Sequence, residues 1–90
     1  MDKVILNGKR MITRERTHAY LKRKFGFPEY YGRNLDDLWD LLSSWDREME
    51  IVIVNHKAVT ENLDGYGVSL LKLFRELDEE SRHIHITYQN

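Results

Sequence analysis

The sequence predicts an α/β fold in which a three-stranded parallel sheet is packed with about four helices. Two short apolar runs, Val4–Leu6 and Ile51–Val54, have the length and composition of buried strands. A third segment, His83–Tyr88, alternates polar and apolar residues, as a strand with one buried face does. Helical patterns separate the three segments, and strands joined through helices pair in parallel.

The two helices of the first half have clear start and stop signals. We expect a first helix from the cap residue Thr13 to about Phe25, ended by Gly26. A second helix follows from the cap residue Asn34 to about Trp45.

In the second half, the β-branched run at 51–54 is typical of a strand covered on both faces. A short third helix is expected at 58–63, after which Gly65 and Gly67 break the chain. A strongly periodic fourth helix runs from Val68 to about Glu80.

Size and composition limit the kind of protein. Ninety residues suit a single domain over 1–90. The absence of cysteine excludes a disulfide framework, a thiolate metal site and a thiol nucleophile. The N-terminal apolar run is too short for a signal peptide and no stretch is long enough to span a membrane, so we expect a cytoplasmic protein.

The net charge of −1 hides a strong asymmetry. Residues 1–33 contain nine Lys and Arg against three Asp and Glu, whereas residues 34–90 contain five against twelve. Such separation says nothing about fold, but it bears on the choice of partner.

The helix expected at 34–45 divides into two faces. Its core side holds Leu35, Leu38, Leu41, Leu42 and Trp45, and its opposite side holds Asp36, Asp37, Asp40, Ser43 and Ser44, with Trp39 on the border. Asp36 and Asp40 lie one turn apart, and no Lys or Arg in the helix neutralises them. Like charges at this spacing cost about 0.2–0.5 kcal/mol. Acids near a helix start are ordinary capping chemistry, but Asp40 lies beyond the first turn, which favours a face that meets a basic partner.

The segment that leads into this helix reads Pro28-Glu29-Tyr30-Tyr31-Gly32-Arg33-Asn34-Leu35-Asp36-Asp37-Leu38-Trp39-Asp40. It resembles the central motif of the barstar family, PEYYGxNLDxLWD, at all eleven defined positions. The similarity extends more weakly to both ends of the chain. The resemblance implies a barstar-like fold, with a three-stranded parallel sheet packed with helices, and inhibition of a secreted ribonuclease of the barnase type.

The resemblance also implies roles for individual residues. Asp40 matches the aspartate that occupies the substrate phosphate site of the enzyme, and Tyr30 matches the tyrosine that packs at its catalytic histidine. Asp36 and Glu76 match acids that meet further basic side chains. The expected partner-binding residues are Tyr30, Gly32, Asn34, Asp36, Trp39, Asp40, Ser43, Ser44, Trp45 and Glu76. A carboxylate can take the place of phosphate because an RNA-binding cleft is cationic.

The loop before the second helix carries further expectations. Tyr30 is expected to point outward and Tyr31 inward, and Gly32 to supply a positive φ before the cap. Two residues depart from the family pattern. Arg33 is basic at the variable position, where its charge opposes that of a cationic cleft, and Ser44 replaces a glycine, so the helix end can differ.

The expected partner is a small basic ribonuclease, bound one-to-one by a chain that is a monomer when free. No cofactor, membrane contact or direct nucleic-acid binding is expected. The same acidic face could instead bind another basic protein, such as a toxin that is not a nuclease. RNA contact through the basic first helix is a third possibility, but Tyr20 is the only aromatic residue nearby and a solvated face is the simpler interpretation.

The remaining titratable residues give weaker signals. His83 and His85 share a strand face at a spacing that can serve a metal, but no third ligand is evident, so we expect a solvated face and no metal. His18 is isolated and is expected at the surface. Asp36 and Asp40 could in principle form an acid–base pair, yet no partnering nucleophile is present, so we expect no enzyme.

Overall fold

The computed structural model describes residues 2–90 and confirms the predicted sheet. Strands β1 (Asp2–Asn7), β2 (Met49–Val54) and β3 (Ile84–Tyr88) pair in parallel in the order β1-β2-β3. Because sequential strands are neighbours and parallel, each connection crosses over through helices.

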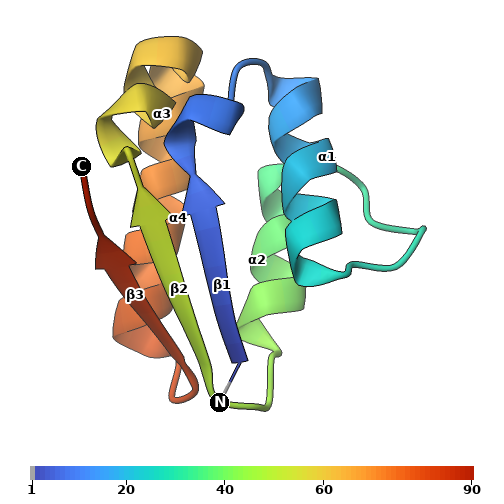
Figure 1. Ribbon diagram of the computed structural model, residues 1–90. Helices are drawn as coiled ribbons and strands as arrows, with labels where there is room; N and C mark the ends of the chain where they lie inside the picture. Colours follow the sequence, from blue (N-terminus) through green and yellow to red (C-terminus); the bar gives the residue numbers. More distant parts are fainter. Residues whose placement is uncertain (1) are drawn as a thin grey trace.

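Four α-helices and one short 3-10 helix make those connections (Figure 1). They are η1 (Gly8–Arg10), α1 (Arg14–Phe25), α2 (Leu35–Ser43), α3 (His56–Leu63) and α4 (Gly65–Glu80). The predicted caps are confirmed: the Thr13 side chain accepts from the Arg16 N–H, Gly26 ends α1 at φ 70°, and Asn34 caps α2. In Figure 1, α4 passes behind β2 and β3, and α1 and α2 lie on the β1 side.

The helices cover one face of the sheet, and the core lies between them. On that face Met49, Ile51 and Ile53 of β2 are fully buried. On the other face Val52 is also buried, but it lies in register between Ile5 and Thr87, which are exposed. The expectation of a strand covered on both faces is therefore wrong, because the helices cover one face and Val52 is the only buried residue of β2 on the other.

The start of α4 differs from the prediction. Gly65 and Gly67 were expected to break the chain, but both lie within the helix. A Cβ at Gly67 would overlap the backbone carbonyl of Val59 in α3, whereas a Cβ at Gly65 would meet nothing within 4 Å. Gly67 is therefore a close-approach residue that lets two helices touch, not a breaker.

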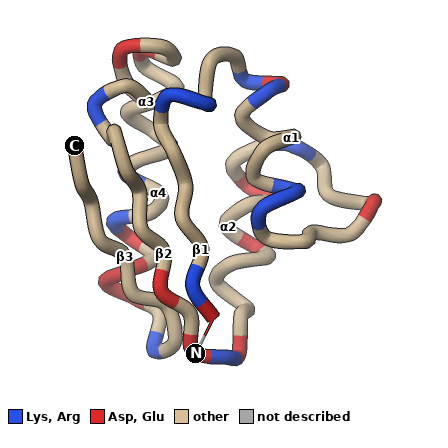
Figure 2. The backbone as a smooth tube through the Cα atoms, viewed as in Figure 1, with Lys and Arg blue, Asp and Glu red and all other residues tan. Residues whose placement is uncertain are grey.

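Charge follows the elements. Lys and Arg are frequent along η1 and α1, whereas the only charges on α2 are acidic (Figure 2). Within residues 2–90, no helix has both the length and the apolar content needed to cross a membrane.

Candidate functional site: the acidic face of α2 and the loop before it

The loop between α1 and α2 turns one tyrosine outward and the next into the core, as predicted. Tyr30 is 79% exposed, whereas Tyr31 is 4% exposed. The Tyr31 backbone N–H donates to the Pro28 carbonyl at 3.0 Å, and its ring packs 4.8 Å from that of Phe27. The buried Tyr31 side chain thus anchors the loop, and the loop holds Tyr30 in solvent.

A set of hydrogen bonds joins this loop to the first turn of α2. The Gly32 N–H donates to Oδ2 of Asp37 at 2.6 Å, and the Asn34 side-chain amide donates to the Gly32 carbonyl at 3.2 Å. The Asp37 N–H donates in turn to Oδ1 of Asn34 at 2.8 Å. We call Gly32, Asn34 and Asp37 the loop clasp.

The positive φ expected at Gly32 is found instead at Arg33, at 56°. The prediction for Gly32 was therefore wrong, but the position still requires glycine. A Cβ there would overlap Oδ2 of Asp37 and lie 3.0 Å from the Asn34 amide nitrogen. The absence of a side chain, not a left-handed conformation, is what the loop clasp needs.

Only two of the three predicted acids form an open face. Asp37 is half-buried and committed to the loop clasp. Asp36 and Asp40 are exposed, and within residues 2–90 neither carboxylate makes an ion pair or a side-chain hydrogen bond. The first turn beyond the cap thus carries one structural carboxylate and one free carboxylate, and the second turn carries the other free one.

A groove between α2 and α4 extends this acidic face. A hollow of about 360 Å³ is lined by Asp36, Trp39, Ser69, Lys72, Leu73 and Glu76. A second hollow of about 190 Å³ continues along Trp39 and Ser43 to Glu80. The structure therefore places Glu76 and Asp36 around one hollow. It adds Glu80, which sequence reasoning missed although it lies one turn beyond Glu76 on the same helix.

The end of α2 is closed by a side chain. The helix ends at Ser43, two residues before the predicted end. The Ser44 hydroxyl donates to the Asp40 carbonyl at 2.8 Å, and Ser44 keeps a negative φ, so no left-handed residue is needed there. Trp45 is half-buried with the Arg47 guanidinium 5.3 Å from its ring centre, and its indole N–H is buried with no acceptor within residues 2–90. Because its indole N–H is buried, Trp45 can contact a partner only through the exposed part of its ring.

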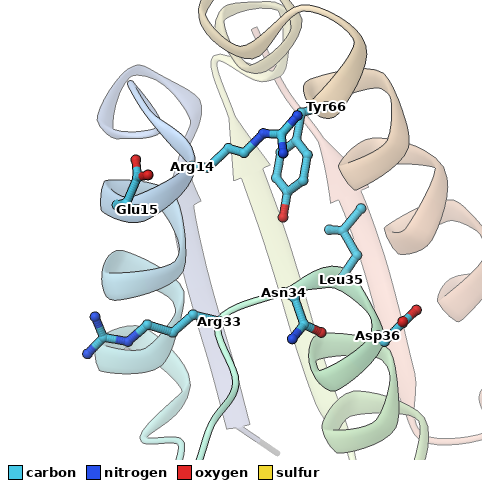
Figure 3. Close-up of a pocket in the computed structure, with 7 residues that line it drawn as sticks. All are labelled: Arg14, Glu15, Arg33, Asn34, Leu35, Asp36 and Tyr66. Carbon is cyan, nitrogen blue, oxygen red and sulfur yellow. The ribbon is translucent and has the colours of Figure 1, made fainter.

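A further hollow, of about 410 Å³, opens at the N-terminal end of α2. Its lining residues are Arg14, Glu15, Arg33, Asn34, Leu35, Asp36 and Tyr66. The Arg14 guanidinium lies 4.2 Å from the centre of the Tyr66 ring. Figure 3 shows the Arg33 side chain pointing toward α1 and away from Asp36, so its charge does not neutralise that carboxylate.

His18 was expected at the surface, and that prediction was wrong. It is 1% exposed, with Nδ1 2.6 Å from the Tyr31 hydroxyl and Nε2 2.5 Å from the Tyr66 hydroxyl. Burial, with a smaller contribution from the charge of Arg33, lowers the pKa of His18. Burial raises the pKa of both tyrosines, and Arg14 partly opposes this at Tyr66. The neutral ring joins α1, the loop and α4, a role that no local pattern indicated because the partners are distant in sequence.

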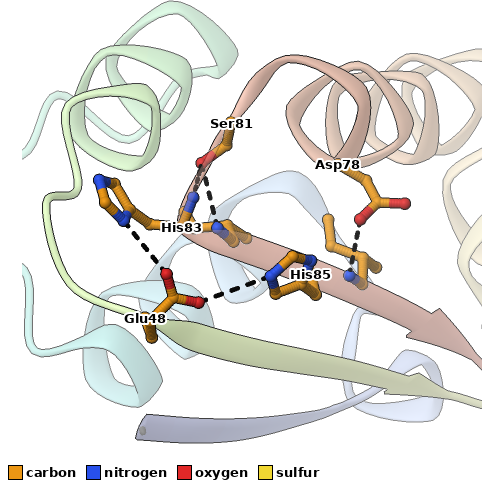
Figure 4. Close-up of polar contacts among 7 residues, drawn as sticks. Glu48, Asp78, Ser81, His83 and His85 are labelled. Carbon is orange, nitrogen blue, oxygen red and sulfur yellow. Dashed lines mark hydrogen bonds and ion pairs between the residues drawn. The ribbon is translucent and has the colours of Figure 1, made fainter.

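The two histidines of β3 share a single carboxylate. Glu48 lies 3.4 Å through Oε1 from Nδ1 of His83 and 3.5 Å through Oε2 from Nε2 of His85 (Figure 4). Each ring faces a different oxygen, so the three groups form paired contacts rather than converging on one point. Across residues 2–90, no group of three His, Cys, Asp or Glu side chains is arranged to hold a metal ion.

Comparison with known proteins identifies the family of the chain. The sequence model of one family, described as Barstar (barnase inhibitor), matches residues 1–89. A Bacillus subtilis (strain 168) protein named "Putative ribonuclease inhibitor YrdF" is 40% identical over 81 residues, which cover 89% of each chain. Both matches span nearly the whole sequence, including the loop clasp and α2. The chain therefore belongs to the barstar family.

Proposed function

We propose that the protein inhibits a ribonuclease of the barnase type by placing the acidic face of α2 and the loop before it in the RNA-binding cleft. Its family and the name of its Bacillus relative support a ribonuclease-inhibitor role. The observation that carries the proposal is the pair of exposed carboxylates, Asp36 and Asp40, with no partner of their own within residues 2–90.

Asp40 is the central anchor of the proposed interface. It lies in the second turn of α2, next to the half-buried Trp39, so it is held on a rigid element. A carboxylate at a cationic cleft accepts charge-assisted hydrogen bonds in place of the RNA phosphate. Tyr30 adds an exposed ring, and aromatic rings beside charge are typical of interface centres.

Asp36, Glu76 and the groove residues complete the surface. Asp36 and Glu76 meet further basic side chains of the enzyme, and Asn34, Trp39, Ser43, Ser44 and Trp45 support the contact. Gly32 acts by allowing the loop clasp to form. The loop clasp fixes the loop before binding, and preorganisation of this kind lowers the entropic cost of association. The chain acts one-to-one, as a monomer, without catalysis or cofactor.

Inhibition of a purified barnase-type ribonuclease tests the proposal directly. The wild-type chain is titrated into the enzyme while hydrolysis of a fluorogenic RNA substrate is followed, and we expect full inhibition near one equivalent. Asp40→Asn removes the charge and preserves the shape, so binding should weaken by about 2 kcal/mol or more, about 30-fold in Kd.

Glu61→Gln is the matched control because Glu61 is an exposed acid on α3, away from α2. It should inhibit like the wild type, and thermal unfolding of all three chains checks that each is folded. Absence of inhibition at an equimolar excess of wild type contradicts the proposal. Equal inhibition by Asp40→Asn and Glu61→Gln removes Asp40 from the centre of the interface.

A second candidate is a basic protein that is not a nuclease. Lys72 lines the groove between Asp36 and Glu76, so the acidic surface contains a positive charge of its own. A partner that also presents an acid would match this mixed pattern better than a uniformly cationic cleft does. Binding to such a partner without any inhibition of ribonuclease activity would favour this candidate.

A further inference from the structure

A small cationic hollow lies between η1 and α1, and it shares no lining residue with the groove between α2 and α4. It has a volume of about 210 Å³, and its lining residues are Arg10, Ile12, Arg16, Ala19, Tyr20 and Arg23. Arg10 comes from the end of η1 and the other two arginines come from α1, so the fold brings the three together. The pattern of α1 in the sequence does not show that Arg10 lies beside it, because Arg10 belongs to a separate element.

The floor of this hollow is rigid and partly apolar. The Tyr20 ring is buried, and its hydroxyl accepts the Asn7 backbone N–H at 2.9 Å. The guanidinium carbons of Arg10 and Arg23 lie 5.5 and 5.6 Å from the centre of that ring. Both arginines are thus held beside one aromatic ring, and the ring is not free to stack on a third group.

Among the described residues, these three positive charges have no acidic partner. None of the lining residues is a carboxylate, and none of the three arginines makes an ion pair within residues 2–90. Elsewhere on α1 a basic residue does find a partner, since Lys22 lies 3.1 Å from Glu29. The hollow at the N-terminal end of α2 is lined by both Arg14 and Asp36, so its charge is mixed. The hollow beside Tyr20 is the strongly cationic one.

We infer that this hollow binds the phosphodiester backbone of a nucleic acid. Guanidinium groups present planar pairs of N–H donors that match phosphate oxygens. Three of them around one hollow favour a ligand with several closely spaced negative charges. Base stacking has no part in it because the Tyr20 ring is already covered, so the contact is independent of base sequence. This revises the expectation of no direct nucleic-acid binding and does not depend on the proposed inhibitor role.

This inference is tested by fluorescence anisotropy with two labelled 12-nucleotide single strands of the same sequence, one of RNA and one of DNA. The full chain is titrated into each probe at several salt concentrations between 20 and 200 mM. Three phosphate contacts give a slope of log K against log salt of about −2. Each of Arg10→Gln, Arg16→Gln and Arg23→Gln should weaken binding and reduce the slope by about 0.7. Arg82→Gln is the matched control, because Arg82 is an exposed arginine outside the hollow.

The outcomes are distinct. Equal binding of RNA and DNA supports backbone recognition, and tighter binding of RNA supports it with an added contact to the 2′-hydroxyl. Absence of binding at 20 mM salt overturns the inference, and so does an Arg82→Gln effect as large as that of Arg16→Gln. An oligoglutamate peptide that binds as tightly as either strand also overturns it, because the hollow would then select any acidic chain. Ribonuclease inhibition is measured separately, so failure here leaves the inhibitor proposal standing.

Discussion

Gly32 has no room for a side chain because the Asp37 carboxylate and the Asn34 amide close around it. Gly32→Ala forces one of these groups away and breaks a charge-assisted hydrogen bond. We expect the free energy of unfolding to fall by about 1–3 kcal/mol, measured by urea denaturation.

Asp37→Ala provides the control for this prediction, because it removes the carboxylate with which the new methyl group collides. Gly32→Ala should therefore cost less in the Asp37→Ala background than in the wild type. Equal costs in the two backgrounds would mean that the loop clasp does not determine the choice of glycine.

His18 should make stability depend on pH. Its pKa is lowered in the fold, first by burial and then by Arg33, so the folded chain keeps it neutral while the unfolded chain takes up a proton near pH 6.5. The unfolded state then binds more protons, and the free energy of unfolding falls as pH drops from about 6.5 toward the lowered folded value. The loss has a slope of at most about 1.4 kcal/mol per pH unit, and this contribution is fully present above pH 6.5.

His18→Gln isolates this effect because glutamine does not titrate. Urea unfolding at pH 8.0 and at pH 5.5 gives the difference for each chain, and the wild type should lose more stability than the variant on acidification. The difference between the two chains isolates His18, because every other residue is the same in both. Parallel losses in the two chains would contradict a neutral, buried His18.

At the scale of elements, the two glycines of α4 predict opposite mutational effects. Gly67→Ala places a methyl group against the Val59 carbonyl in α3 and should lower the free energy of unfolding by about 1–3 kcal/mol. Gly65→Ala meets nothing within 4 Å and should raise it by up to about 1 kcal/mol, because alanine favours the helix. Thermal unfolding of both variants checks the pair, and two shifts of the same sign would contradict it.

Local sequence signals predicted which helices and strands exist, whereas the exact start of α4 depends on tertiary contacts. Thr13, Gly26 and Asn34 marked helix ends correctly because caps are local chemistry. The chain break predicted at Gly65 and Gly67 was wrong, because glycine also allows close helix packing and the sequence does not show which helix lies opposite.

The candidate site shows the same division. The motif from Pro28 to Asp40 predicted the acidic face, and the structure leaves Asp36 and Asp40 exposed and free of partners within residues 2–90. The motif alone could not show that Asp37 is committed to the loop clasp, or that His18 is buried between Tyr31 and Tyr66. Those contacts join residues 5, 13 and 48 positions apart, and the longer two depend on how the elements pack.

At the scale of the whole molecule, the charge asymmetry of the sequence places many of the basic residues on η1 and α1 and many of the acidic ones on α2 and α4, although Lys72 and Arg14 lie beside the acids. Lys and Arg positions are concentrated along η1 and α1, whereas the charged positions of α2 are all acidic (Figure 2). Oppositely charged surfaces guide diffusional encounter, whereas the basic region repels a cationic enzyme. The molecule should therefore approach a basic ribonuclease with the acidic face of α2 leading.

This separation predicts how association depends on salt, given the proposed function. The association rate constant with a barnase-type ribonuclease, measured by stopped-flow fluorescence, should fall about tenfold or more between 20 and 500 mM salt, because screening shortens the range of attraction. Glu80→Gln, at the far end of the groove, should slow association and flatten its salt dependence with little effect on dissociation. Asp40→Asn should instead speed dissociation, because it removes a contact made only in the complex. An effect of Glu80→Gln on dissociation as large as that of Asp40→Asn would mean that both acids make direct contacts of similar weight. Asp40 would then not be the central anchor of the interface.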